Sequence, residues 1–189
     1  MTSFRFRMPT GISFYPTHYI SHVLIVVSVV VAILGFIFRD LISYFWLHAI
    51  PVMRETIPYI LWQVALYQFL HGDILHILFN SYFLYQVGPE VESRMTRREF
   101  ILFFFGNTLF VAVALWFLSS GNTIGISGFC MALLSYLYMD LQKIRHPLAS
   151  QILFMLVLNI ALGFIGNISF VWHAAGALFG VVWWISKKK

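Results

Sequence analysis

Four polar residues within apolar stretches have the types that acyl transfer requires. Ser127 opens one apolar run, His173 lies near the start of a later one, and His76 and Asn80 stand four residues apart in an earlier one. Residues at i and i+4 share one face of a helix, so His76 and Asn80 can act on a single group. Ser127 is the candidate nucleophile and His173 the general base that takes its proton. His76, Asn80 and the Ser127 backbone N–H are candidate donors to the oxyanion.

Glycines accompany both candidate catalytic residues. Gly125 and Gly128 flank the serine, where the lack of a side chain lets the backbone come close to a ligand, and we assign Gly125 to the oxyanion side of the site. Gly176 and Gly180 follow His173 and form a G-x-x-x-G face that permits close contact between helices. The G-x-S-G pattern alone is weak evidence, because small residues also serve simple helix packing.

The elements that position these residues belong to an all-α polytopic membrane protein. Of 189 residues, 60% are hydrophobic and 10% charged, and the mean hydropathy is +0.84, whereas a soluble domain carries roughly 25% charged residues. The same values exclude intrinsic disorder. The net charge of +5 does not indicate nucleic-acid binding, because the basic residues form no stripe interleaved with aromatics. The lipid bilayer is therefore the expected surrounding of the chain.

Six apolar segments are candidates to cross a hydrocarbon core, which needs about 20 helical residues. They are Ile20–Phe38, Ile74–Val91, Phe100–Leu118, Ser127–Met139, Leu148–Ile165 and Ser169–Ile185. No repeat divides the chain, so we expect one domain over residues 1–189 without a separate soluble domain. The fourth segment is short, about 20 Å at 1.5 Å per residue. We expect it to begin inside the bilayer and to face water there.

The distribution of basic residues predicts the orientation. With six spans, 10 of the 12 Lys and Arg residues lie on one side, and only Arg39 and Arg54 lie on the other. The positive-inside rule then places both termini in the cytoplasm. The second, fourth and sixth segments all run from outside to inside. Their polar residues therefore lie at similar depth in the outer part of the membrane, which favours one shared site.

The first loop has a different character. Leu41–Leu70 is long and apolar but is interrupted by Pro51 and Pro58. Apolar runs of about 10–14 residues are more often interfacial or re-entrant than spanning, and this loop also carries Trp and Tyr residues, which are enriched at the headgroup level. We expect the loop to be half-submerged in one leaflet.

Other interpretations stay open on the residues alone. Asp73 is the acidic residue nearest the right depth, but it precedes a helix and suits an N-cap, so a serine–histidine dyad is preferred to a triad. A metal site at His71 and His76 lacks the H-E-x-x-H pattern. A cysteine nucleophile at Cys130 lacks a neighbouring base. A small transporter would need charges along a pathway, and no segment carries one at its middle.

The chain resembles the rhomboid intramembrane serine proteases, above all the bacterial GlpG-type members. The resemblance rests on three motifs in order along six spans: His76-x-x-x-Asn80, Gly125-x-Ser127-Gly128 and His173-x-x-Gly176-x-x-x-Gly180.

The resemblance implies a six-transmembrane-helix rhomboid-like bundle with an amphipathic first loop, in a bacterial inner membrane. It implies hydrolysis of peptide bonds in transmembrane protein substrates, near the outer end of their spans. The family uses a Ser–His dyad without metal or cofactor, which falls on Ser127 and His173. Its oxyanion site falls on His76, Asn80 and the Ser127 backbone.

Three departures from the family pattern bear on rate and substrate preference. A Trp-Arg pair of the first loop reads Trp62-Gln63, Met131 stands where tyrosine is frequent, and Trp172 precedes the histidine where a small residue is usual. An alternative within the resemblance is a pseudoprotease that binds transmembrane clients. Such proteins typically lack the serine or the histidine, and this chain has both.

Overall fold

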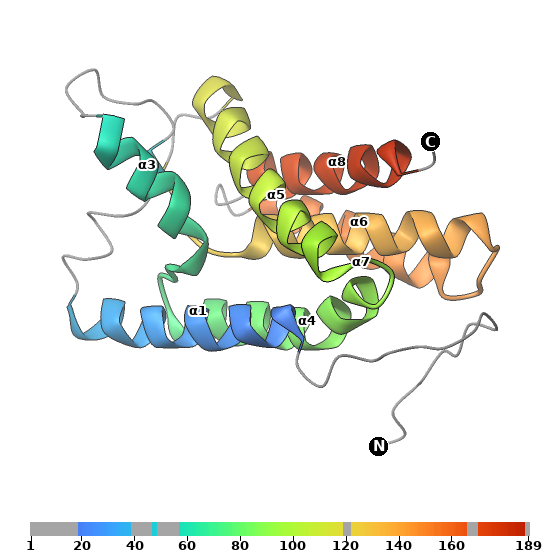
Figure 1. Ribbon diagram of the computed structural model, residues 1–189, viewed down its shortest axis with the longest axis horizontal. Coiled ribbons are helices and arrows are strands. Elements are labelled where there is room, and N and C mark those ends of the chain that lie inside the picture. The colour runs from blue at the N-terminus through green and yellow to red at the C-terminus, as the bar shows by residue number, and fades with distance from the viewer. Residues whose placement is uncertain (1–18, 39–46, 49–56, 119–121, 166–169, 188–189) are drawn as a thin grey trace.

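The computed structural model describes residues 19–38, 47–48, 57–118, 122–165 and 170–187, and these form a helical bundle (Figure 1). The helices are α1 (Ile20–Ile37), α3 (Ile57–Leu66), the short 3-10 helix η1 (Tyr67–Phe69), α4 (Ile74–Glu92), α5 (Arg97–Leu118), α6 (Ser127–Lys143), α7 (Ala149–Ile165) and α8 (Phe170–Ser186). Two short strands, β1 (Leu47–His48) and β2 (Asn122–Thr123), pair antiparallel.

Each of the six predicted apolar segments coincides with a helix to within a few residues at either end. The largest difference is in α6, which continues past Met139 to Lys143 because polar residues extend the helix beyond its apolar run. At 17 residues, α6 is about 26 Å long, so the fourth helix is longer than the predicted Ser127–Met139, whereas its expected start inside the bilayer stays a prediction. By length and composition alone, α1 and α5 could cross a membrane, and α7 and α8 are shorter apolar helices.

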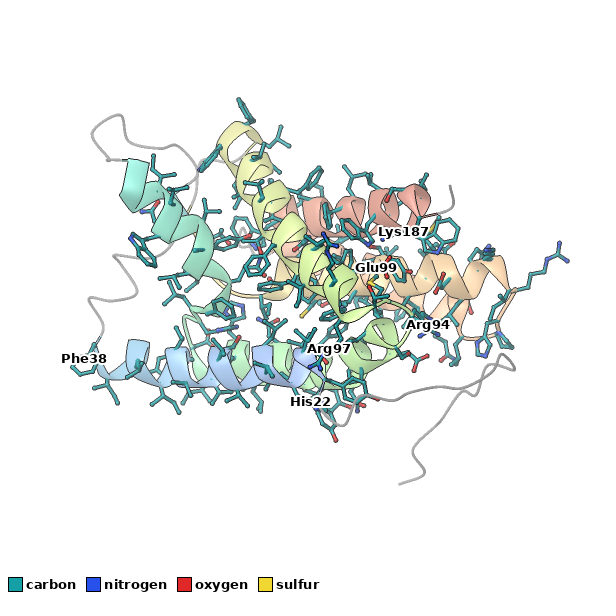
Figure 2. The ribbon with its side chains drawn as sticks, viewed as in Figure 1. His22, Phe38, Arg94, Arg97, Glu99 and Lys187 are labelled. Carbon is teal, nitrogen blue, oxygen red and sulfur yellow. The ribbon has the colours of Figure 1, made fainter. Side chains whose placement is uncertain are left out.

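The outer faces of the bundle are apolar. Large hydrophobic side chains stand exposed along several helices, including Val26 and Ile37 of α1, Phe79 of α4 and Phe154 of α7. Figure 2 shows another, Phe38, at the end of α1. Soluble monomers rarely expose contiguous apolar surface of this kind. The interior, by contrast, contains buried polar groups. This arrangement suits a protein whose outer faces contact lipid.

Helices α1 and α4 lie side by side and antiparallel (Figure 1). Glu92, the last residue of α4, accepts hydrogen bonds from the backbone N–H groups of Ile20 and Ser21, at 2.7 and 3.1 Å. The carboxylate thus caps the positive end of α1. A Cβ atom at Gly88 would lie 2.5 Å from Ser21 Cβ, so the two helices touch closely at this point.

Helix α6 forms the centre of the bundle. It packs against α4, α5, α7 and α8, and all of its residues from Ser127 to Leu137 are buried. Its most extensive contact is with α8, where Gly176 and Gly180 allow a very close approach. The element that carries the candidate nucleophile is therefore fixed from several sides.

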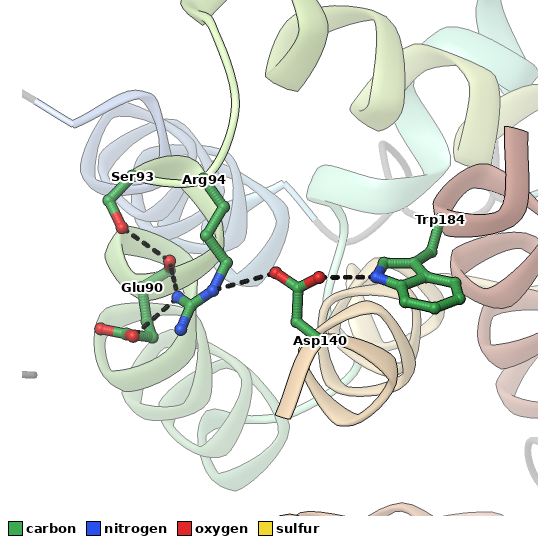
Figure 3. A network of polar contacts seen from close by, with 5 residues as sticks. All are labelled: Glu90, Ser93, Arg94, Asp140 and Trp184. Carbon is green, nitrogen blue, oxygen red and sulfur yellow. Dashed lines mark hydrogen bonds and ion pairs between the residues drawn. The ribbon is translucent and has the colours of Figure 1, made fainter. Parts of the chain in front are cut away.

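A polar network joins α4, α6 and α8 at the ends opposite the candidate residues (Figure 3). Arg94 Nη1 pairs with Glu90 at 2.6 Å, and Arg94 Nε pairs with Asp140 at 3.1 Å. The same Asp140 carboxylate accepts a hydrogen bond from Trp184 Nε1 at 2.6 Å. The starts of these helices also lie together, since Gly125 before α6 contacts His76 of α4 and Gly128 of α6 contacts Gly176 of α8. The three helices therefore run in the same direction.

The first loop is described only in part. Residues 41–46 and 49–56, on which much of the prediction of a half-submerged Leu41–Leu70 loop depends, lie outside the described residues. Within the described part, the strand pairing matches Leu47 with Thr123 and His48 with Asn122, which ties this loop to the segment before α6. In α3, Leu61 and Trp62 are exposed, whereas Gln63 points inward and is buried.

Candidate active site

Ser127 is the first residue of α6, and its side chain is buried with 8% of its surface exposed. It follows Gly125, whose φ of 106° lies in the left-handed region that favours glycine. The chain thus turns sharply immediately before the helix begins. The serine sits at the positive end of the helix dipole, where a developing negative charge is stabilised.

The contact between α6 and α8 brings the neighbourhood of Ser127 to that of His173. A Cβ atom placed on Gly176 would lie 2.0 Å from the carbonyl oxygen of Gly128. A Cβ atom on Gly128 would lie 3.4 Å from the carbonyl oxygen of Trp172. The residue after the serine therefore touches the residue before the histidine, and both lie on adjoining turns of the two helices.

The imidazole of His173 is oriented by the backbone of α7. Its Nδ1 lies 3.1 Å from the carbonyl oxygen of Asn159. A carbonyl oxygen only accepts, so the proton of the neutral ring is on Nδ1. Nε2 then carries the lone pair that a general base needs.

His76 and Asn80 lie beside Gly125, on the side of the site formed by α4. A Cβ atom at Gly125 would lie 2.7 Å from His76 Cε1, 2.8 Å from His76 Nε2 and 3.7 Å from Asn80 Nδ2. A side chain at position 125 would collide with the His76 imidazole, whereas Asn80 would lie at an ordinary contact distance. The structure thus brings all four polar side chains singled out in the sequence to one region.

The backbone N–H of Gly125 is not directed at the oxyanion side of the site. Its N–H donates to the carbonyl oxygen of Tyr67 at 2.8 Å, so it is already engaged. Tyr67 is itself fixed, because its hydroxyl donates to the carbonyl oxygen of Thr108 at 3.1 Å. Gly125 therefore leaves room for the His76 ring and allows the chain to turn before α6, and its hydrogen bond to Tyr67 of η1 fixes that turn.

The remaining candidates have other partners in the structure. Asp73 Oδ1 accepts from the backbone N–H of His76 at 2.8 Å and so caps α4. Cys130 is buried in the hydrophobic core, among apolar side chains. Within the described residues there is no group of three or more His, Cys, Asp or Glu side chains that could hold a metal ion.

Two contacts at the site were not foreseen from the sequence. One is the Asn159 carbonyl that orients His173, which no sequence pattern could indicate because it is a backbone group. The other is His71, which was considered only as a metal ligand. Its buried ring lies against His76, with 4.8 Å between ring centroids. The sequence signal for this contact was the series His71, His76 and Asn80, which places a second histidine close to the candidate oxyanion donors.

The chain is similar to one family model and to several curated proteins. The family model described as the rhomboid domain matches residues 59–187. The chain is 29% identical over 130 residues to rhomboid-like protease 3 of Toxoplasma gondii, covering 64% of this chain and 49% of that protein. It is 28% identical over 79 residues to rhomboid protease GlpG of Yersinia pestis (strain Pestoides F), covering 42% of this chain and 28% of that protein. The chain thus spans about half or less of the length of these curated relatives.

Proposed function

The chain belongs to the rhomboid family, and we propose on that basis that it is an intramembrane serine endopeptidase. Its substrates are transmembrane proteins, which it cleaves near the outer end of their spans. The observation that carries this proposal is the contact of Gly128 with Gly176. This contact sets the start of the Ser127 helix against the turn that holds His173.

The proposed reaction is acyl transfer to Ser127 followed by hydrolysis. His173 Nε2 takes the proton from Ser127 Oγ while Oγ attacks the carbonyl carbon of the scissile bond. The tetrahedral intermediate collapses with cleavage of the C–N bond, and His173 gives the proton to the leaving amine. Water then attacks the acyl-enzyme with the same histidine as base, which releases the carboxylic acid and restores the serine.

The negative charge of the intermediate develops on the former carbonyl oxygen. His76, Asn80 and the Ser127 backbone N–H are the proposed donors to this oxygen, since His76 and Asn80 both lie beside Gly125. Loss of one such donor typically lowers the rate about 10²–10³-fold. The bond between His173 Nδ1 and the Asn159 carbonyl supplies the orientation that an acidic third residue gives in a triad. No metal or cofactor takes part in this proposed reaction.

We further propose that the protein is a single six-span domain of a bacterial inner membrane with both termini in the cytoplasm. The exposed apolar faces of the helices support residence in the membrane. Orientation is supported by basic residues at the ends of α4, α6 and α8, among them Arg94, Lys143 and Lys187. Figure 2 shows Lys187 close to Glu99 at this end of the bundle.

The proposal is tested with purified protein reconstituted in liposomes together with a reporter that contains one transmembrane segment. The wild type is expected to cut the reporter near the outer end of its span, and Ser127→Ala and His173→Ala are expected to leave it intact. Binding of the reporter without cleavage would instead identify a client-binding pseudoprotease. Cleavage by Ser127→Ala at the wild-type rate would overturn the mechanism.

A further inference from the structure

His71 occupies a fully buried position between η1 and α4, with 0% of its surface exposed. Its Nδ1 lies 3.1 Å from the carbonyl oxygen of Phe69, and its Nε2 lies 3.2 Å from Nδ2 of Asn80. Both ring nitrogens are therefore engaged, one by the turn before α4 and the other by a candidate oxyanion donor. A buried polar side chain with two specific partners calls for an account of what it does there.

The partners fix the tautomer of the ring. The Phe69 carbonyl can only accept, so the proton of neutral His71 is on Nδ1. Nε2 is then an acceptor, and it faces the amide nitrogen of Asn80, which can only donate. The reverse placement of the Asn80 amide would bring its oxygen against the Nε2 lone pair, and two acceptors would repel each other. The contact is consistent only when Asn80 presents its NH₂ group toward His71.

This contact decides which way the Asn80 amide faces. An asparagine NH₂ group has two N–H bonds in a fixed plane, and one of them is used by His71. The direction of the second N–H bond is then fixed as well. Its nitrogen lies beside Gly125, 3.7 Å from where a Cβ atom of that residue would be. We propose that His71 is a positioning residue, which holds the Asn80 amide so that its second N–H is aimed at the oxyanion. This inference rests on the proposed protease function and extends it to a residue outside the four that carry the reaction.

The turn at η1 anchors both sides of this arrangement. The Tyr67 carbonyl holds Gly125 through its N–H, and the Phe69 carbonyl, two residues later, holds His71. One rigid turn thereby sets the spacing between the segment before α6 and the donor on α4. Preorganised donors of this kind stabilise a transition state without reorganisation during the reaction.

The contact requires a neutral His71. Burial and, to a smaller extent, the neighbouring His76 lower the pKa of His71 to about 4, against the opposing effects of the Phe69 carbonyl and the Asp73 carboxylate. Nε2 therefore remains an acceptor at neutral pH.

The test is a double-mutant cycle on cleavage of a transmembrane reporter. Asn80→Ala is expected to lower kcat about 10²-fold. His71→Phe, which keeps a ring but removes the acceptor, is expected to lower kcat about tenfold with KM unchanged, since the donor is misaimed but present. In the Asn80→Ala background, His71→Phe should cause no further loss. His71→Gln, whose side-chain oxygen can accept from Asn80, should recover part of the rate.

His22→Phe is the matched control. His22, in α1, stacks on Tyr85 of α4, the helix that also carries Asn80, with 5.3 Å between ring centroids. The buried Nε2 of His22 has no hydrogen-bond partner in the described part of the chain. The His22→Phe variant should therefore leave kcat unchanged. Losses from His71→Phe and Asn80→Ala that multiply in the double variant would overturn the proposal. A rise in KM without a fall in kcat would do the same.

A second readout does not depend on activity. Nitrogen-15 NMR of the His71 ring is expected to show the neutral tautomer protonated on Nδ1, with an Nε2 resonance that moves in Asn80→Ala. A ring protonated on Nε2, or an Nε2 resonance indifferent to Asn80→Ala, would overturn the contact. Should the wild type cleave no reporter, the proposed function fails, while the NMR measurement still decides whether His71 holds Asn80.

Discussion

Replacement of Gly176 by alanine tests whether the contact of α6 with α8 holds the site together. A Cβ atom at this position would lie 2.0 Å from the carbonyl oxygen of Gly128, 2.7 Å from its carbonyl carbon and 3.0 Å from its Cα. Carbon–oxygen contacts between packed helices are about 3.3 Å or longer, so the helices would have to separate by about 1.3 Å. Because the opposing atoms belong to the backbone, no side-chain rotation can relieve the clash.

The separation would act directly on the proposed catalytic pair. Ser127 precedes Gly128, and His173 lies one turn before Gly176. A misplacement of about 1 Å can lower a rate about 10²-fold, and overpacking a core costs about 1–3 kcal/mol or more. We therefore expect Gly176→Ala to lower kcat about 10²-fold and to lower the melting temperature as well.

Gly72→Ala is the matched control for this change. A Cβ atom at Gly72 would have Ile124 Cδ1 as its nearest neighbour, at an ordinary contact distance of 3.6 Å. Thermal unfolding in detergent and cleavage of the reporter are measured for both variants, and Gly72→Ala should match the wild type in both. Wild-type unfolding and cleavage by Gly176→Ala would show that the helices accommodate a methyl group at their contact, and so would contradict a tight contact at this position.

Three further predictions concern the supports of the site. Asp140→Ala removes the partner of both Arg94 and Trp184, so it should lower the melting temperature more than Asp140→Asn, which can still accept from the indole; equal effects in a thermal shift assay would contradict this. Glu92→Ala removes the cap of α1 and should lower the unfolding free energy by about 1–2 kcal/mol relative to the wild type; an unchanged value in a denaturant titration in detergent would contradict the cap. The pKa of His71 is lowered to about 4 in the folded protein, so the unfolded state takes up the proton first and stability should fall as the pH is lowered from about 6.5 towards 4. His71→Phe should reduce that dependence, and an unaltered stability profile between these pH values would count against the assignment.

The sequence predicted the helices well because each one combines an apolar run with a clear boundary. Asp73 before Ile74 is an N-cap in pattern and in structure, and α4 begins where that pattern places it. The end of α6 was harder to predict. Hydropathy stops at Met139, whereas backbone hydrogen bonding continues through polar residues to Lys143. An apolar pattern reports burial or lipid contact, and a helix can extend beyond either.

The candidate site was predictable in its side chains and not in its backbone contacts. His76 and Asn80 at i, i+4, with a serine and a histidine at the starts of parallel helices, were sufficient to place four groups in one region. The carbonyl groups of Tyr67, Phe69 and Asn159 could not be predicted, since every residue has one and only the fold determines where it points. His71 was misjudged for the same reason, because its role depends on which acceptor and donor it faces.

The most direct test of the proposed activity is labelling of the detergent-purified protein with a fluorescent fluorophosphonate, which reacts with an activated serine. Labelling is expected for the wild type and for His22→Phe, and none for Ser127→Ala or His173→Ala, with all four proteins shown to be folded by thermal unfolding. Labelling that persists in Ser127→Ala, or a folded wild type that stays unlabelled while its reporter is also uncut, would contradict the assignment of Ser127 as an activated nucleophile.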